Sequence, residues 1–224
     1  DEVVTSGGEA KRQLSTARQS KKIQFDGPVY LTGPNRYPNV IPEETFVIET
    51  ALDKSKWILN AGPDKAEETL DDYIKILQRA KSLNIPMLCT NPDKMVVHGN
   101  TTHMCAGYLA AYYSSIGGVV SYVGKPYPAV FERCKSLSGK MDASRYLMIG
   151  DNLETDIRGA NSIEFSSLLL GTGVHKITDK SGCNLDLSAI QSCQNKLSSF
   201  ADYVMTRLRS VSYTHLRAHE TNVD

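Results

Sequence analysis

The stretch "MIGDNLETDIRGA", Met148 to Ala160, places two aspartates five positions apart directly after an apolar run. The run "YLMIG" predicts a strand over 146–150, and the residues after it predict a helix over about 155–161. Asp151 would then lie at the carboxyl end of a strand, which is where open α/β sheets bind ligands. Thr155 is expected to cap the following helix, with Asp156 in its first turn.

The rest of the chain alternates strands and helices in the same way. Apolar runs predict strands over 27–33, 46–50, 56–62, 87–90, 119–124, 146–150 and 166–173, and helical spacing predicts helices over 66–83, 105–116, 128–137 and 155–161. Strands that alternate with helices predict βαβ units and a parallel sheet. The expected fold class is therefore α/β.

A lysine precedes the two aspartates at the end of the previous predicted strand. Lys125 lies in "GKPYP", Gly124 to Pro128, where two prolines stiffen the loop and begin the next helix. By itself such a lysine is more often a solvated loop residue, and Asp151 and Asp156 alone could be a turn acid and a helix-start acid. Together they fit a magnesium phosphate site, because carboxylate oxygens suit Mg²⁺ and a lysine is a point charge for phosphate.

Composition limits the classes of partner. The 224 residues carry 25 Lys+Arg and 25 Asp+Glu, so there is no basic excess for nucleic acid. No apolar run approaches the roughly 20 residues that span a bilayer, so we expect no membrane partner. The five cysteines are odd in number and lack a CxxC pair, which favours a reducing, cytoplasmic setting, with a Cys183–Cys193 bridge left as an alternative.

The motifs together resemble a known superfamily. "GKPYPAVFERC" followed by "YLMIGDNLETDIRGANS" resembles motifs three and four of the haloacid dehalogenase (HAD) superfamily, and the spacing resembles its class IIA, the NagD-like and nitrophenylphosphatase-like branch. "VVTSGGEAKRQL" resembles that branch's link from core to cap, and "LCTNPDKMVVHGN" (Leu88–Asn100) resembles the cap signature. "GTGVHK" (Gly171–Lys176) and the helix "CAGYLAAYYSSIGG" fit the same subgroup. The similarity extends over nearly all of residues 1–210.

The resemblance implies a domain organisation. It is a HAD-like Rossmannoid parallel-sheet core with an inserted α/β cap, divided as 1–6 (end of core and entry to the cap), 7–104 (cap) and 105–210 (C-terminal part of the core). Residues 211–224 begin with "VSYTHLRAHET", which resembles one reading frame of a sequencing adapter. The two histidines in it have the spacing of a helical zinc pair, but we exclude this tail from the fold.

The resemblance also implies roles for particular residues. Asp151 would be a Mg²⁺ ligand, Asp156 would support the metal, and Lys125 would bind the transferring phosphoryl group. Asn91 and Asp93 would lie on the cap face over the substrate, although "NPD" is also the composition of a plain turn. Asn152 is a weaker substrate-binding candidate. The implied activity is Mg²⁺-dependent hydrolysis of a small phosphorylated metabolite through an aspartyl phosphate, and neither the particular ester nor the oligomeric state follows from the sequence.

The family's nucleophile motif, a "DxDG"-like pair of aspartates, has no counterpart in the 224 residues. Asp53 and Asp186 each lack a second aspartate two places on. We therefore expect that the nucleophile and the first core strands precede residue 1, and that this chain is an inactive fragment of an active parent. A non-catalytic phosphate- and metal-binding protein on the same scaffold is the alternative, and an unrelated nucleotide-binding α/β enzyme is disfavoured because GxGxxG and GxxxxGK[ST] loops are absent.

Overall fold

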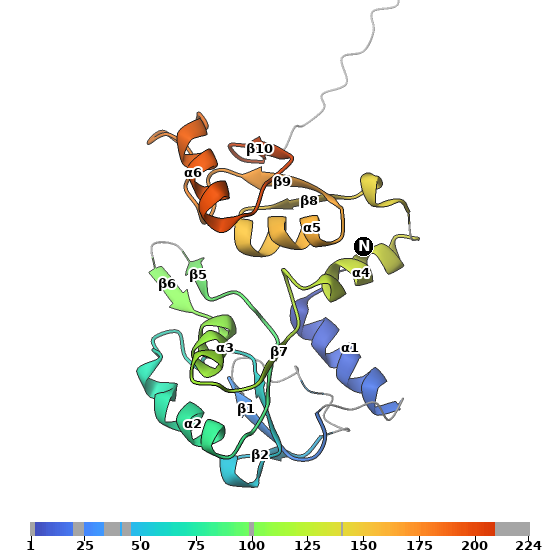
Figure 1. Ribbon diagram of the computed structural model, residues 1–224, viewed down its shortest axis with the longest axis vertical. Helices are drawn as coiled ribbons and strands as arrows, with labels where there is room; N and C mark the ends of the chain where they lie inside the picture. Colours follow the sequence, from blue (N-terminus) through green and yellow to red (C-terminus); the bar gives the residue numbers. More distant parts are fainter. Residues whose placement is uncertain are drawn as a thin grey trace, which may run out of the picture.

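The computed structural model describes residues 3–19, 25–33, 41, 46–98, 101–139 and 141–208. These residues form two α/β lobes, each built on its own parallel sheet (Figure 1). Helix α1 (Ser6–Gln19), which packs on the first lobe, contacts α4 (Pro128–Leu137), which leads to the second. The predicted α/β class with parallel sheets is confirmed. Residues 209–224, which include the whole of the predicted adapter tail, lie outside the described residues.

The first lobe is a five-stranded parallel sheet. Its strands run in the order β2 (Ile48–Glu49), β1 (Val29–Thr32), β3 (Trp57–Asn60), β4 (Met87–Cys89) and β7 (Val120–Tyr122). Helices α2 (Asp71–Ser82) and α3 (Ala106–Ser115) cover one face, and α1 (Ser6–Gln19) packs on the other. Both faces are therefore buried, which explains why strand β3 reads as an unbroken apolar run rather than an alternating one.

Strand β7 completes this sheet at one edge. It pairs with β4 in parallel, with Val120 opposite Met87. The sequence predicts that α3 and β7 belong to the core, after a boundary at residue 104, and that this part of the core lacks pairing partners. The observed pairing differs, because β7 finds its partner in the strand that ends just before "TNPD". The predicted boundary therefore falls inside the group of elements that builds the first lobe.

The second lobe is a three-stranded parallel sheet. Its order is β10 (Tyr203–Met205), β9 (Ser166–Leu170) and β8 (Leu147–Gly150). The π-helical turn η3 (Leu153–Ile157), α5 (Arg158–Ser162) and α6 (Leu187–Leu197) pack around it, and α4 (Pro128–Leu137) leads into it. Among the described residues β8 pairs only with β9, so its other edge is open. Leu147 and Ile149, which share one face of this strand, are 50% and 42% exposed.

Several elements were not predicted from the sequence. They are α1, the antiparallel hairpin of β5 (Met95–His98) and β6 (Thr101–Met104), the short 3-10 turns η1 (Leu52–Lys54) and η2 (Ala143–Arg145), α6 and β10. Helix α2 also begins later than the predicted residue 66. The carboxylate of Asp72 accepts a hydrogen bond from the backbone N–H of Thr69 at 2.8 Å, which fixes the start of the helix there.

Two further observations concern the cysteines and the helices. All five cysteines are free thiols, so the Cys183–Cys193 alternative is not formed. Within the ranges that the structure describes, no helix has the length and apolar character needed to cross a membrane.

Candidate active site

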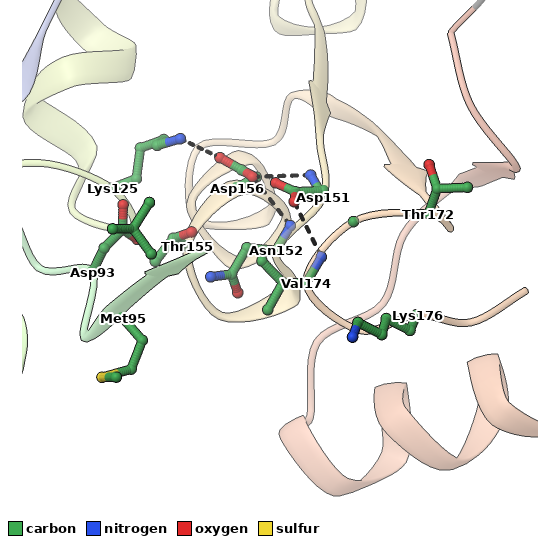
Figure 2. Close-up of a pocket in the computed structure, with 12 residues that line it drawn as sticks. Asp93, Met95, Lys125, Asp151, Asn152, Thr155, Asp156, Thr172, Val174 and Lys176 are labelled. Carbon is green, nitrogen blue, oxygen red and sulfur yellow. Dashed lines mark hydrogen bonds and ion pairs between the residues drawn. The ribbon is translucent and has the colours of Figure 1, made fainter. Parts of the chain in front are cut away.

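A cavity of about 310 Å³ lies where the two lobes meet, at the carboxyl end of β8. The second lobe contributes Asp151, Asn152, Asp156 and the loop after β9, the first lobe contributes Asp93 and the start of the β5–β6 hairpin, and Lys125 comes from the segment that links the lobes. Figure 2 shows Lys125, Asp156 and Asp151 close together, with Asp93 beside Lys125. Five of the six predicted site residues therefore line one cavity.

Asp156 holds this arrangement together. Its Oδ1 accepts a hydrogen bond from Lys125 Nζ at 2.5 Å, and its Oδ2 accepts from the backbone N–H groups of Asp151 and Asn152 at 3.1 and 3.2 Å. Its side chain is only 4% exposed, against 41% for that of Lys125. A Cβ on Gly150 would lie 2.3 Å from the Asp156 carboxyl carbon, so the close approach requires glycine at that position. Both carboxylate oxygens of Asp156 are thus committed to protein groups.

Asp151 presents the second carboxylate to the cavity. Its Oδ2 accepts a hydrogen bond from the backbone N–H of Val174 at 3.1 Å, and among the described residues no group donates to its Oδ1. The loop after β9 packs directly on it, since a Cβ on Gly173 would lie 2.0 Å from Asp151 Cβ. Asp151 is therefore fixed from one side and open on the other.

The carboxylate oxygens at this cavity suit one kind of cation. Within the described ranges no cluster of three or more His, Cys, Asp or Glu side chains could hold a metal, so the closed ligand set of a structural zinc site is absent there. Mg²⁺ needs less from a protein, because it keeps several waters and is commonly held by one or two carboxylates together with substrate phosphate. The open oxygen of Asp151 beside Lys125 fits that requirement.

The loop that carries Asp93 is braced on several sides. Asn91 Oδ1 accepts from the Asp93 backbone N–H at 3.2 Å, and the backbone N–H of Gly107 donates to the Asp93 carbonyl at 3.0 Å. A Cβ on Gly107 would lie 2.0 Å from the Pro92 carbonyl oxygen, and one on Gly124 would lie 2.6 Å from Pro92 Cδ. Asn91, the sixth predicted site residue, borders a neighbouring cavity, and its side-chain oxygen accepts a hydrogen bond within its own loop.

The carboxyl of Asp93 has an altered environment. Burial raises its pKa most, the nearby charge of Lys125 lowers it, and the charges of Asp156 and Asp151 raise it further. The Thr155 side chain also lowers the pKa of Asp93. The prediction that Thr155 caps the helix after β8 is wrong: Asn152 is the N-cap, with its Oδ1 accepting from the Glu154 backbone N–H at 2.9 Å. Thr155 instead lines the cavity together with Asp93.

No role was predicted for the loop after β9, although this loop, like Asp151, comes at the carboxyl end of a strand in a parallel sheet. It follows a buried strand of a parallel sheet, so it emerges at the same edge. His175 Nε2 accepts a hydrogen bond from the backbone N–H of Leu153 at 3.0 Å, and burial lowers the pKa of this imidazole. Together with the Val174 bond to Asp151, this contact ties the loop to the Asp151 turn.

The two aspartates rejected as nucleophiles have structural positions. Asp53 forms an exposed ion pair with Arg79 Nη2 at 2.8 Å, and Asp186 caps α6 by accepting from the backbone N–H groups of Ser188 and Ala189. Neither lines the cavity.

Comparison with known proteins agrees with this geometry. Residues 122–189 match the sequence model of the HAD-hydrolase-like family. The chain is similar to the acid sugar phosphatase of Staphylococcus haemolyticus, at 25% identity over 175 residues that cover 78% of this chain and 62% of that protein. It is also similar in structure to a haloacid dehalogenase-like hydrolase from Brucella suis, with 31% identity, a TM-score of 0.68 and coverage of 78% of this chain and 66% of that one.

The glycerol phosphate phosphatase of Mycobacterium tuberculosis, solved in complex with magnesium, shares the fold at 22% identity, a TM-score of 0.56 and coverage of 77% of this chain and 50% of that one. The chain thus spans 62% and 66% of the lengths of the first two relatives. The matched segment begins at the end of β7, includes Lys125, Asp151 and Asp156, and extends into α6. The segment that carries Lys125, Asp151 and Asp156 is therefore similar in sequence to HAD-like hydrolases.

Proposed function

We propose that the cavity is the phosphate- and cation-binding half of an active site that hydrolyses phosphate monoesters of small metabolites. The observation that carries the proposal is the bond between Lys125 Nζ and buried Asp156, whose other oxygen holds the Asp151 turn. The Asp156 carboxylate thereby positions both the Lys125 ammonium, which would bind phosphate, and the neighbouring Asp151 turn. The phosphatase name of the acid sugar phosphatase relative supports the same activity.

Lys125 would bind an oxygen of the phosphoryl group. Its ammonium has three donors, and Asp156 uses one of them at 2.5 Å. The remaining donors point a fixed positive charge at the place where negative charge spreads during phosphoryl transfer. Groups placed in this way are a major source of rate acceleration, because they need no rearrangement when the charge develops.

Asp151 would hold Mg²⁺ through its open oxygen, and Asp156 would support the site through its bonds to the Asp151 turn. When bound, the ion would neutralise phosphate charge and orient the phosphoryl oxygens. The magnesium in the M. tuberculosis glycerol phosphate phosphatase structure supports this assignment. Asp93 and, more weakly, Asn152 would face the alcohol part of the ester from opposite lobes. The proposed setting is the cytoplasm.

The chemistry we propose proceeds through an aspartyl phosphate. An aspartate oxygen attacks phosphorus, the ester P–O bond breaks and the alcohol leaves, and water then cleaves the new P–O bond. No Asp-x-Asp sequence occurs in the 224 residues, so the attacking aspartate is not supplied by them. We expect the 224-residue chain to bind Mg²⁺ and phosphate without turnover.

The same absence is the one observation that favours the alternative, a non-catalytic phosphate- and metal-binding protein on this scaffold. The two functions differ in what a longer protein containing this chain would do. A hydrolase releases phosphate from p-nitrophenyl phosphate with Mg²⁺ present, whereas a binding protein only retains the ester.

The test uses the chain itself. Isothermal titration calorimetry should show Mg²⁺-dependent binding of inorganic phosphate, weakened about 10-fold or more by Lys125→Met and by Asp151→Asn. Lys196→Gln, in the last turn of α6, is the matched control and should bind as the parent chain does. The proposal fails if phosphate binding is absent, or if neither cavity substitution weakens it. Hydrolysis of p-nitrophenyl phosphate by the chain, abolished by Asp151→Asn, would contradict the separate claim that the nucleophile lies outside it.

A further inference from the structure

The loop after β9 carries a second cation to the cavity. Lys176 lines the same 310 Å³ cavity as Lys125, and Figure 2 shows the two lysines on opposite sides of it, with Asp151 and Val174 between them. Lys125 is paired with Asp156. Lys176 forms no ion pair with any residue that the structure describes, so its charge is available to a ligand.

The backbone at Lys176 is in an unfavourable region. Its φ is +48°, in the left-handed region that residues with a Cβ seldom adopt. The turn around it enforces this conformation: the Lys176 backbone N–H donates to the Gly173 carbonyl at 3.1 Å, and that of Ile177 donates to the Gly171 carbonyl at 2.9 Å. Residues held in such sparsely populated backbone regions cluster at active sites, ligand clamps and switch regions.

The loop is also fixed relative to Asp151. The Val174 N–H donates to Asp151 Oδ2, and His175 Nε2 accepts from Leu153 N–H, so bonds on both sides of Asn152 join the two loops. Since Asp151 and Lys125 are held by Asp156, Lys176 stands at a set position relative to the phosphate end of the cavity. A ligand group that binds Lys176 would therefore lie at a defined distance from the phosphate that binds Lys125.

One part of the cavity wall is apolar. Met95 and Val96 face the cavity from the first lobe, and Val174 faces it from the second; all three are partly exposed there. A short carbon chain would bury against them, with a charged group at each end. Such a wall suits a compact substrate skeleton.

We propose that Lys176 forms a second anion subsite, and that the preferred ligands are small phosphate esters whose alcohol part carries a further anionic group. The inference rests on the proposed function, because the first anion is the phosphate held at Lys125. Within that function it names the substrate class. A carboxylate and a second phosphate share the required charge, and the experiment separates them.

The test compares ligands with matched skeletons. 3-Phosphoglycerate and glycerol 3-phosphate both have three carbons and one phosphate, but only the first has a carboxylate. In calorimetric titrations with Mg²⁺ at low ionic strength, the chain should bind 3-phosphoglycerate at least about 5-fold more tightly, as expected for a partly exposed charge pair. Propane-1,3-diol bisphosphate has a second phosphate in place of the carboxylate. Whichever of 3-phosphoglycerate and the bisphosphate binds more tightly identifies the anion that Lys176 prefers.

The variants isolate Lys176. Lys176→Gln should reduce the preference for 3-phosphoglycerate to about 1-fold while leaving the affinity for inorganic phosphate unchanged, and Lys176→Arg should retain the preference. Lys180→Gln, on the same surface segment but outside the cavity lining, should change neither. The inference is overturned if the parent chain shows no preference, or if Lys176→Gln keeps it. Loss of inorganic phosphate binding in the parent chain would instead refute the proposed function, and the subsite with it.

Discussion

Replacing Asp156 by asparagine tests whether this buried carboxylate organises the cavity. Its two oxygens accept three hydrogen bonds, one from the Lys125 ammonium and two from the backbone N–H groups of Asp151 and Asn152. Asparagine has nearly the same shape, but one of its ends is a donor. In either orientation its NH₂ group faces a donor, so at least one bond is replaced by a repulsive contact.

The size of the effect follows from these contacts. A hydrogen bond to a charged group contributes about 1.5–3 kcal/mol, and the unmatched donor adds a similar order of cost. The Lys125 side chain is 41% exposed and can turn toward water, so the loss of its ion pair adds little. We expect Asp156→Asn to reduce the free energy of unfolding by about 2–3 kcal/mol. For a chain of this size that corresponds to a Tm lower by about 5–10 °C.

Urea unfolding followed by far-UV circular dichroism gives the free energy, and amide hydrogen exchange at Asp151 and Asn152 reads the two backbone bonds directly. Asp142→Asn is the matched control: Asp142 is exposed and its side chain makes no capping bond, so a change within about 0.5 kcal/mol is expected. The reasoning is refuted if Asp156→Asn matches Asp142→Asn in stability and leaves both amides as protected as in the parent chain.

Three other perturbations have definite expected outcomes. Gly173→Ala places a Cβ 2.0 Å from that of Asp151, so it should lower the free energy of unfolding by about 1–3 kcal/mol and weaken Mg²⁺ binding in calorimetry. His175 has a lowered pKa in the folded chain, so unfolding takes up a proton and stability should fall as pH drops from about 6.5; His175→Gln should flatten this part of a Tm-against-pH curve. Burial raises the pKa of Cys89 to about 12, so a thiol reagent at pH 8 should label exposed Cys183 in the native chain and leave Cys89 unlabelled until the chain unfolds, as peptide mapping would show.

Most of the regular structure could be predicted because it depends on local patterns. The strands β1, β3, β4, β8 and β9 and the helices α3 and α4 lie within predicted ranges, since their apolar runs and helical periods are strong and their ends carry Gly or Pro. The missed elements have weaker local signals. Helix α1 is rich in Gly, Ser, Thr and charged residues, and it is buried along one side only because Ala10 and Leu14 meet the face of a sheet formed later in the chain.

The composition of each sheet could not be predicted in the same way. Strand β7 was expected to lie unpaired in the core, yet it is the edge strand of the first lobe. Strand pairing depends on which edges come together in space, and the apolar run "VVSYVG" is equally compatible with either sheet. Only the folded chain shows that β4 and β7 lie side by side in parallel, with Met87 opposite Val120 and Cys89 opposite Tyr122.

The candidate site, like the sheets, could be predicted from the sequence only in part. By itself, the sequence determines that Lys125, Asp151 and Asp156 each come shortly after an apolar strand, and it predicts that they emerge at one edge of one sheet. In the structure β7 and β8 belong to different sheets, so Lys125 meets the two aspartates because the lobes pack together. The sequence does not indicate which of these side chains bonds to protein groups and which stays open to a ligand. The tertiary structure decides that Asp156 uses both oxygens on protein donors while Asp151 keeps one open, and that Asp93 reaches across from the other lobe. It also brings Lys176 to the cavity wall opposite Lys125. Sequence order and periodicity place a residue at the end of an element, whereas its hydrogen-bond partners depend on groups that are distant in the chain and meet only when the lobes pack.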